Sequence, residues 1–253
     1  MKPSPTILLG IVTLTYVGVA VAQFNLPNLP VDPFKIGEGA KKIVKGSTGI
    51  GLQEELSIGG SVAVEIVSTY GGVWRDDAAT RRVNLIGKAL ARYSDRPDLP
   101  FRFGLLNSPS INGFSAPGGY VFITKGAYEA AQNDDELAGI LAHEITHVVR
   151  RHALRIISRN EFISGAVGVT AGSTSDFRSY DLGISDISRT LFKTGYDSGT
   201  EFDADRRGRA LAAQSGFAAD GLAQFLSRLA AVSASEPTFS THPPLKDRMS
   251  RLK

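Results

Sequence analysis

The pentapeptide His143-Glu144-Ile145-Thr146-His147 contains residue types that can hold a metal ion and move a proton. Residues four apart on an α-helix lie one turn apart on the same face, so His143 and His147 can reach one ion. Glu144 is rotated by about 100° from His143, which places it beside the ion. There its carboxylate can take a proton from a water that zinc has made more acidic. The motif predicts two zinc ligands, His143 and His147, and a general base, Glu144.

A helix with two surface histidines and a salt-bridging glutamate is the competing interpretation. Half of the chain's four histidines fall in this pentapeptide, and its apolar neighbour Ala142 favours a buried position. The chain has no cysteine, which excludes thiolate-ligated zinc, a thiol nucleophile and disulfides. A metal site must therefore use histidine and carboxylate side chains.

A catalytic zinc needs a third protein ligand and keeps one open position. One class of zinc sites has a third histidine at the position that Ala153 occupies here, so this class is excluded. His152 follows His147 by five residues and would turn away from the metal face, which predicts a surface histidine or one that supports the ligands from behind. Glu161 would lie about 21 Å away along a continuing helix.

Glu201 is the remaining candidate, and it shares a helix face with Asp205. Glu201 would bind the zinc, and Asp205 would orient a ligating histidine through its other ring nitrogen. A second interpretation is that Ser198-x-x-Glu201 is a capping box, in which Glu201 bonds the helix start. Spacing alone leaves both interpretations open.

The elements around these residues indicate the α+β class, with helices around a small sheet. Periodic apolar residues and end signals predict helices over 53–70, 76–93, 134–157, 200–214 and 220–232, and a last turn within 246–252. Alternating or β-branched residues predict strands over 101–105 and 120–124, and turn residues predict a loop over 108–119. The strongest helix, 134–157, carries the motif, and its predicted buried stripe is Leu137, Ile140, Leu141, Ile145 and Val148. Small residues over 164–175 predict a loop, with a helix of small residues as the alternative.

Composition limits the organisation and the partners. The length of 253 residues suits one domain, and a net charge of +3 without a basic run argues against nucleic-acid binding. An apolar run after Lys2 that ends Ala20-Val21-Ala22 predicts a signal peptide over 1–22, cleaved after Ala22. A Pro/Gly-rich leader over 23–52 and a peptidase domain over 53–253 follow. We expect a soluble periplasmic or otherwise extracytoplasmic protein, and an uncleaved membrane anchor is the alternative.

His242 is the only histidine outside the 143–152 stretch, and two prolines follow it. Prolines fix the backbone and would hold its imidazole with little entropy to lose. It is either a site residue that reaches over a cleft or a surface residue that caps the last helix. The residues themselves leave this open.

Four blocks, in order, resemble the M48 family of zinc peptidases, roughly over Leu56 to Leu252. The stretch 137–148, followed by Arg151-His152, is similar to the family's active-site helix, and 201–205 is similar to its glutamate helix. The stretch 112–121 looks like the strand and loop that border the substrate cleft. Thr241-His242-Pro243-Pro244 with Arg248 is similar to the C-terminal His-Pro motif. Gly113 departs from the family's more frequent alanine, which could loosen this loop.

The resemblance implies a gluzincin-type fold with one zinc per chain, held by His143, His147 and Glu201, and with Asp205 behind a ligand. It also implies substrate contacts at Asn112, Gly118, Gly119 and Tyr120. His242 becomes a site residue in one of two roles. It either donates to the oxyanion, together with Arg248, or occupies zinc's open position and keeps the enzyme latent.

The expected function is that of a zinc endopeptidase acting on unfolded or misassembled envelope proteins, since the chain resembles the compact secreted bacterial members of the family. A substrate peptide could add to a sheet edge near Tyr120 to Ile123. The alternative is a chaperone-like peptide-binding module of the same fold with little turnover. Glu144 speaks against this alternative, because a pure binder needs no general base.

Overall fold

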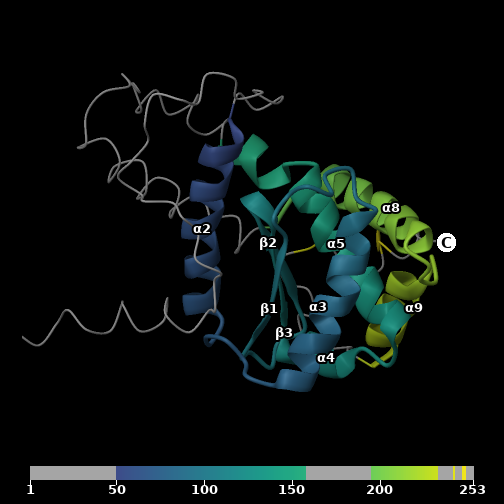
Figure 1. Ribbon diagram of the computed structural model, residues 1–253. Helices are drawn as coiled ribbons and strands as arrows, with labels where there is room; N and C mark the ends of the chain where they lie inside the picture. Colours follow the sequence, from purple (N-terminus) through teal and green to yellow (C-terminus); the bar gives the residue numbers. More distant parts are fainter. Residues whose placement is uncertain (1–49, 158–194, 233–241, 243–246, 249–253) are drawn as a thin grey trace, which may run out of the picture. The chain divides into compact units, whose positions relative to one another are not determined.

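The computed structural model describes residues 50–157, 195–232, 242 and 247–248 (Figure 1). The predicted signal peptide, nearly all of the leader and the predicted loop 164–175 lie outside these residues, as does Glu161. No helix among the described residues is long and apolar enough to cross a membrane. The domain boundaries remain predictions.

The described elements form an α+β fold, as the sequence predicts. In chain order they are α2 (Leu52–Thr69), α3 (Asp77–Arg92), β1 (Arg102–Leu106), β2 (Gly113–Ala116), the short 3-10 helix η1 (Pro117–Gly119), β3 (Tyr120–Thr124), α4 (Lys125–Ala130), α5 (Asp134–Val149), α8 (Ser198–Gln214) and α9 (Gly221–Val232). The predicted ranges agree with α2, α3, α8, α9, β1 and β3 to within about two residues.

The sheet has the strand order β1-β3-β2. β3 pairs in parallel with β1 and antiparallel with β2, so it is the central strand. The prediction that Tyr120 to Ile123 offers a free sheet edge is therefore wrong. The predicted loop over 108–119 is also wrong in part, because β2 and η1 lie within it. All four residues of β2 are buried, and the ring of Phe114 packs 4.1 Å from that of Tyr70.

α5 is the central helix of the fold. It contacts α3, α8, α9 and the sheet, and in Figure 1 the sheet stands between α2 and α5. Asn133 caps its start by accepting a hydrogen bond from the Glu136 backbone N–H at 2.9 Å. Every residue from Glu136 to Val148 is buried, including the whole predicted stripe. The motif on α5 is therefore an interior motif, and the surface interpretation of its histidines is wrong.

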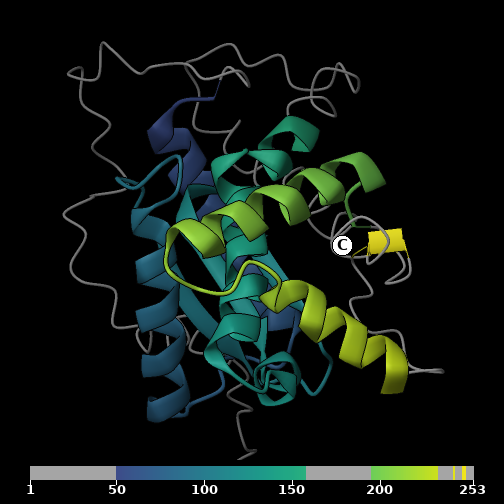
Figure 2. The ribbon, with the colours of Figure 1, turned by 90° about the vertical axis from the view of Figure 1, so that its right-hand side faces the viewer.

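α8 crosses α5 at close range (Figure 2). Gly208 permits this approach, since a Cβ atom there would lie 3.0 Å from the backbone nitrogen of His143. A larger residue would push the two backbones apart. The crossing brings the first turns of α8 against the face of α5 that carries the motif.

The motif helix ends earlier than predicted. α5 ends at Val149. Arg151 has φ 56°, a left-handed backbone conformation that residues other than glycine rarely adopt. A separate helical stretch covers 152–157. The predicted single helix over 134–157 is therefore wrong at this break.

Candidate metal centre

Four side chains from three parts of the chain converge in the interior. One ligand atom from each of His143, His147, Glu201 and His242 lies within 4.8 Å of the other three. α5 supplies the first two and α8 supplies Glu201. His242 lies beyond α9, and its side chain is only 4% exposed, so the interpretation of His242 as a surface residue is wrong.

The two histidines of α5 direct the same ring atom at the centre of this cluster. Their Nε2 atoms lie 3.1 Å apart, and those of His143 and His147 lie 3.4 and 3.7 Å from the Glu201 carboxylate. Burial holds the pKa of His147 well below its usual value, so its ring is neutral. Burial and Arg248 lower the pKa of His143, but Asp205 and Glu201 raise it to about 9. A proton or a metal ion can satisfy the facing nitrogens, and binding of a metal would release the proton.

Glu201 is fully buried and faces the histidines. Burial works against its ionisation, but His242, His143 and His147 hold the pKa of its carboxyl well below the usual value. Its Oε1 atom has no hydrogen-bond partner among the described residues. A buried, ionised oxygen without a donor is what a metal ligand requires, so the residues present fit a metal ion.

The capping-box interpretation of Glu201 is wrong. The N-cap of α8 is Asp197, whose carboxylate accepts hydrogen bonds from the Thr200 backbone at 3.0 Å and from the Thr200 hydroxyl at 2.7 Å. Ser198 is already the first residue of the helix. The cap is therefore supplied without Glu201.

Asp205 lies where the sequence places it, behind His143. Its Oδ1 atom is 2.9 Å from His143 Nδ1. Arg248, which is fully buried, clamps the same carboxylate with Nε 3.0 Å from Oδ2 and a terminal nitrogen 2.5 Å from Oδ1. This pair fixes which nitrogen of His143 can face an ion. Arg248 thus holds Asp205 behind His143, and its role at the oxyanion stays a prediction.

His147 has a different partner on its outer side. Its Nδ1 atom lies 2.9 Å from Nδ1 of His152, which is 4% exposed. The ring of Tyr196 stacks on that of His147 with centroids 4.4 Å apart, and burial raises the pKa of this tyrosine. The sequence did not single out Tyr196; its place one residue before the α8 cap was the available signal.

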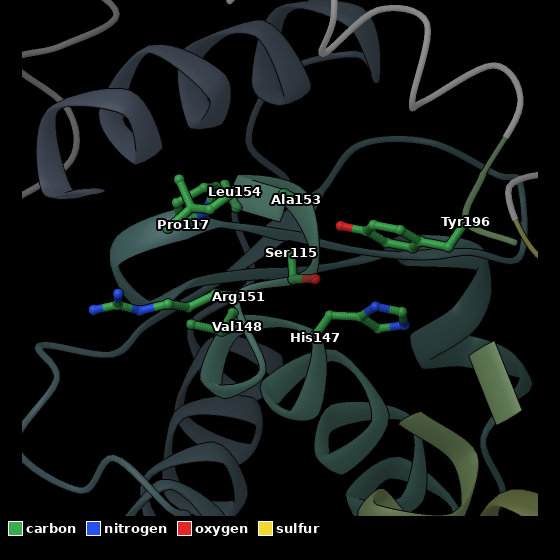
Figure 3. Close-up of a pocket in the computed structure, with 9 residues that line it drawn as sticks. Ser115, Pro117, His147, Val148, Arg151, Ala153, Leu154 and Tyr196 are labelled. Carbon is green, nitrogen blue, oxygen red and sulfur yellow. The ribbon is translucent and has the colours of Figure 1, made fainter. Parts of the chain in front are cut away.

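A pocket opens beside His147 (Figure 3). The end of β2, the residues after α5 and Tyr196 line it. In the figure the ring of Tyr196 lies above that of His147. Arg151 lies at the break after α5, and Ala153 and Leu154 lie in the helical stretch that follows it. The pocket thus has the candidate ligand His147 and the end of β2 in its wall.

Glu144 lies next to the cluster without belonging to it. It is 2% exposed, and its Oε1 atom, 3.8 Å from His242 Nε2, has no hydrogen-bond partner among the described residues. His242 Nδ1 lies 2.7 Å from Glu201 Oε2. Gly113 faces Glu144 from β2, and a Cβ atom there would come within 2.7 Å of Glu144 Oε1. The missing side chain of Gly113 therefore leaves room for the Glu144 carboxylate. Gly113 is a strand residue, so the expectation that it loosens a loop is wrong.

The four predicted substrate contacts are spread along β2, η1 and β3. Asn112 precedes β2 and is buried, with its side-chain oxygen accepting the backbone N–H of Gly113 at 3.0 Å. Gly118 packs on α2, Gly119 packs on Pro100 and Phe101, and Tyr120 lies under the guanidinium of Arg102. These contacts leave their role in substrate binding a prediction.

Comparisons with known proteins show what this chain is similar to. The model of the family described as "Peptidase family M48" matches residues 77–253. A putative beta-barrel assembly-enhancing protease of Vibrio cholerae is 32% identical over 91% of this chain and 48% of its own length. The beta-barrel assembly-enhancing protease of Escherichia coli K12 is 28% identical over 67% of this chain and 35% of its own. The mitochondrial metalloendopeptidase OMA1 of Schizosaccharomyces pombe is 28% identical over 74% of this chain and 57% of its own.

The chain thus spans about half the length of the Vibrio cholerae relative and about a third of the Escherichia coli relative. The region matched by the family model contains α5, α8, His242 and Arg248. It therefore covers all the side chains that converge on the candidate metal centre. On the extent of this match, the chain belongs to peptidase family M48.

Proposed function

We propose that this chain is a zinc-dependent endopeptidase that acts on unfolded or misassembled proteins of the cell envelope. The observation that carries the proposal is the buried set of His143, His147, Glu201 and His242, with the carboxylate of Glu144 beside it. Two imidazoles and one carboxylate form a donor set that zinc favours at catalytic sites.

The zinc would be held by His143, His147 and Glu201. When bound, zinc supplies a Lewis acid that polarises the scissile carbonyl and makes a nearby water more acidic. Glu201 offsets part of the cation's charge in a site from which water is largely excluded. Asp205 holds the ring of His143 in the tautomer that leaves Nε2 free to coordinate.

Glu144 acts as the general base and then as the general acid. It takes a proton from the attacking water and delivers it to the amine nitrogen that leaves when the peptide bond breaks. Its Oε1 atom has no hydrogen-bond partner among the described residues, so it is available to accept that proton. Burial next to the cluster keeps it within reach of a water at the metal.

His242 can serve the site in two ways. As a donor, it would stabilise the oxyanion that forms on the attacked carbonyl. As a fourth ligand, it would occupy the open position of the zinc and keep the protease latent until its segment moves. Its ring atoms lie among the other ligand atoms, as the second role requires, and 3.8 Å from Glu144, as the first role allows.

An extended peptide would bind along β2. β3 is paired on both sides, whereas β2 pairs with a strand on one side only among the described residues. Gly113 at the start of β2 adjoins Glu144, so a peptide bonded to this edge would pass the general base. Backbone recognition of this kind needs an unfolded substrate segment.

The envelope location rests on two observations. The first 22 residues have the pattern of a secretory signal. Two of the relatives are named for enhancing beta-barrel assembly. We therefore propose periplasmic or otherwise extracytoplasmic action on polypeptides, with membrane association only through an uncleaved N-terminus.

Casein degradation by the purified protein tests this function. We expect turnover that a zinc chelator abolishes and added zinc restores. Glu144→Gln keeps the shape of the side chain but cannot accept the proton, so turnover should fall by at least about 100-fold while zinc stays bound. Chelator-resistant turnover, or near-normal turnover of Glu144→Gln, would contradict the proposal. Casein binding without cleavage by the zinc-loaded wild type would favour the chaperone-like alternative.

A further inference from the structure

The two candidate zinc ligands on α5 have different partners at Nδ1, the ring nitrogen that faces away from the metal site. His143 has a carboxylate at its Nδ1 atom, whereas His147 has the ring of His152 at 2.9 Å. We propose that His152 is a positioning residue that accepts a hydrogen bond from Nδ1–H of His147 and so fixes the tautomer in which His147 can bind the metal. This inference rests on the proposed zinc site.

The tautomers of the two rings are coupled. A neutral imidazole carries one proton, so His147 can offer Nε2 to a metal only if the proton lies on Nδ1. Two Nδ1 atoms at 2.9 Å share one hydrogen bond, in which one ring donates and the other accepts. If His147 donates, His152 must accept on Nδ1 and carry its own proton on Nε2. The opposite arrangement would place a proton on the metal-facing nitrogen of His147.

The break after α5 makes this contact possible. On a continuous helix, five residues would rotate His152 by roughly 140° from His147, onto another face. Instead α5 ends at Val149, and the left-handed Arg151 redirects the chain before the stretch 152–157. His152 thereby returns to the side of His147, where it is 4% exposed.

Two partly exposed arginines form ion pairs around the buried Glu55 and hold the break in place. Arg151 contacts the carboxylate of Glu55 at 3.0 Å, and Arg96 contacts the same carboxylate at 2.7 and 3.0 Å. Glu55 is fully buried on α2. A non-glycine residue with positive φ is unfavourable and persists only where its surroundings determine it. These ion pairs meet that condition, and they join the geometry of His152 to α2 and to the chain after α3.

A histidine that merely fills the core is the competing explanation. Its ring could then take either tautomer, and an apolar side chain of similar size would replace it at little cost. The ring of Tyr196 stacks on that of His147, and its centroid lies 5.9 Å from that of the His152 ring. Tyr196 thus contacts both histidines of the hydrogen-bonded pair. A hydrogen bond in such surroundings is costly to leave unmade, which favours a defined donor and acceptor.

Two variants of similar size separate these explanations. Asparagine can place its side-chain oxygen near the position of Nδ1 and accept the hydrogen bond, whereas leucine fills the space without an acceptor. Zinc affinity is measured by competition with a chromophoric chelator. We expect His152→Leu to weaken zinc binding roughly 10- to 100-fold and His152→Asn to stay close to wild type. A core-filling role predicts the reverse order in thermal unfolding of the metal-free proteins, with leucine tolerated and asparagine destabilising.

Equal zinc affinity of wild type and His152→Leu would overturn the inference while leaving the zinc site intact. A wild type that binds no zinc would overturn the proposed function and the inference with it.

A measurement on the wild type keeps the inference testable if a variant fails to fold. Long-range ¹⁵N–¹H correlation spectra of the zinc-loaded protein report which nitrogen of each histidine carries its proton. The expected result is a proton on Nδ1 of His147 and on Nε2 of His152. A proton on Nδ1 of His152, or none on Nδ1 of His147, would overturn the inference.

Discussion

Glu201 must remain ionised although it is fully buried, and its three histidine neighbours make this possible. Glu201→Gln removes the negative charge and keeps the shape of the side chain. We expect a severe loss of zinc affinity, because a neutral amide oxygen is a weaker ligand than a carboxylate. The metal-free fold should lose a modest part of its stability, because the ionised carboxylate interacts with His143 and His242. No helix cap is lost, since Glu201 does not cap α8.

Thermal unfolding with and without added zinc measures both effects of this substitution. Wild type should gain stability from zinc in proportion to the logarithm of its concentration over the dissociation constant. Glu201→Gln should gain far less. A variant that is stabilised by zinc as strongly as wild type would remove Glu201 from the ligand set.

His242 gives a prediction whose sign identifies its role. His242→Ala should lower casein turnover if the ring stabilises the oxyanion, and should raise it if the ring blocks the open position of the zinc. Zinc content, measured by elemental analysis, should be unchanged in both cases because the three other ligands remain. Turnover indistinguishable from wild type, with the metal in place, would rule out both roles.

At the scale of single elements, the start of α8 decides how Glu201 is presented. Asp197 caps this helix through two hydrogen bonds to Thr200, whereas Ser198 lies within the helix. Asp197→Ala should lower the free energy of unfolding by about 1 kcal/mol, the usual effect of losing an N-cap. Chemical denaturation of the metal-free protein measures this change.

Ser198→Ala is the matched control for this prediction, because it removes a neighbouring hydroxyl without touching the cap. Its free energy of unfolding should stay close to that of wild type. A larger loss for Ser198→Ala than for Asp197→Ala would mean that the serine caps the helix after all.

The elements whose residues carry their own signal could be predicted from the sequence. α5 has a polar cap at Asn133 and a periodic apolar stripe, and β3 has β-branched and aromatic residues between glycine and lysine. Both are local patterns. The end of α5 could not be predicted, because Arg151 at the break forms an ion pair with Glu55, which lies far away in the sequence.

β2 escaped prediction for a related reason. It has only four residues, and the Asn112-Gly113 step at its start is typical of a turn. Its strand conformation comes from pairing with β3. Helix spacing indicated the motif residues and the shared face of Glu201 and Asp205, but the family resemblance was needed to choose Glu201 as a ligand. The contacts of His152 and Tyr196 depend on the folded chain.

At the scale of the whole molecule, the first 22 residues determine where the protease would act. If the signal is cleaved after Ala22, mass spectrometry of the protein isolated from its host should find Gln23 as the first residue. The protein should then fractionate with the extracytoplasmic soluble proteins. An intact N-terminus, with the protein in the membrane fraction, would show that the segment is retained as an anchor.

The account depends most directly on one zinc ion that joins α5 and α8 through His143, His147 and Glu201. Elemental analysis of the purified protein measures this. We expect one zinc per chain in wild type and in Glu144→Gln, since Glu144 lies beside the ligands without being one. The double variant His143→Ala/His147→Ala should purify without zinc. Full zinc retention in the double variant, or its absence from wild type supplied with zinc, would contradict the account.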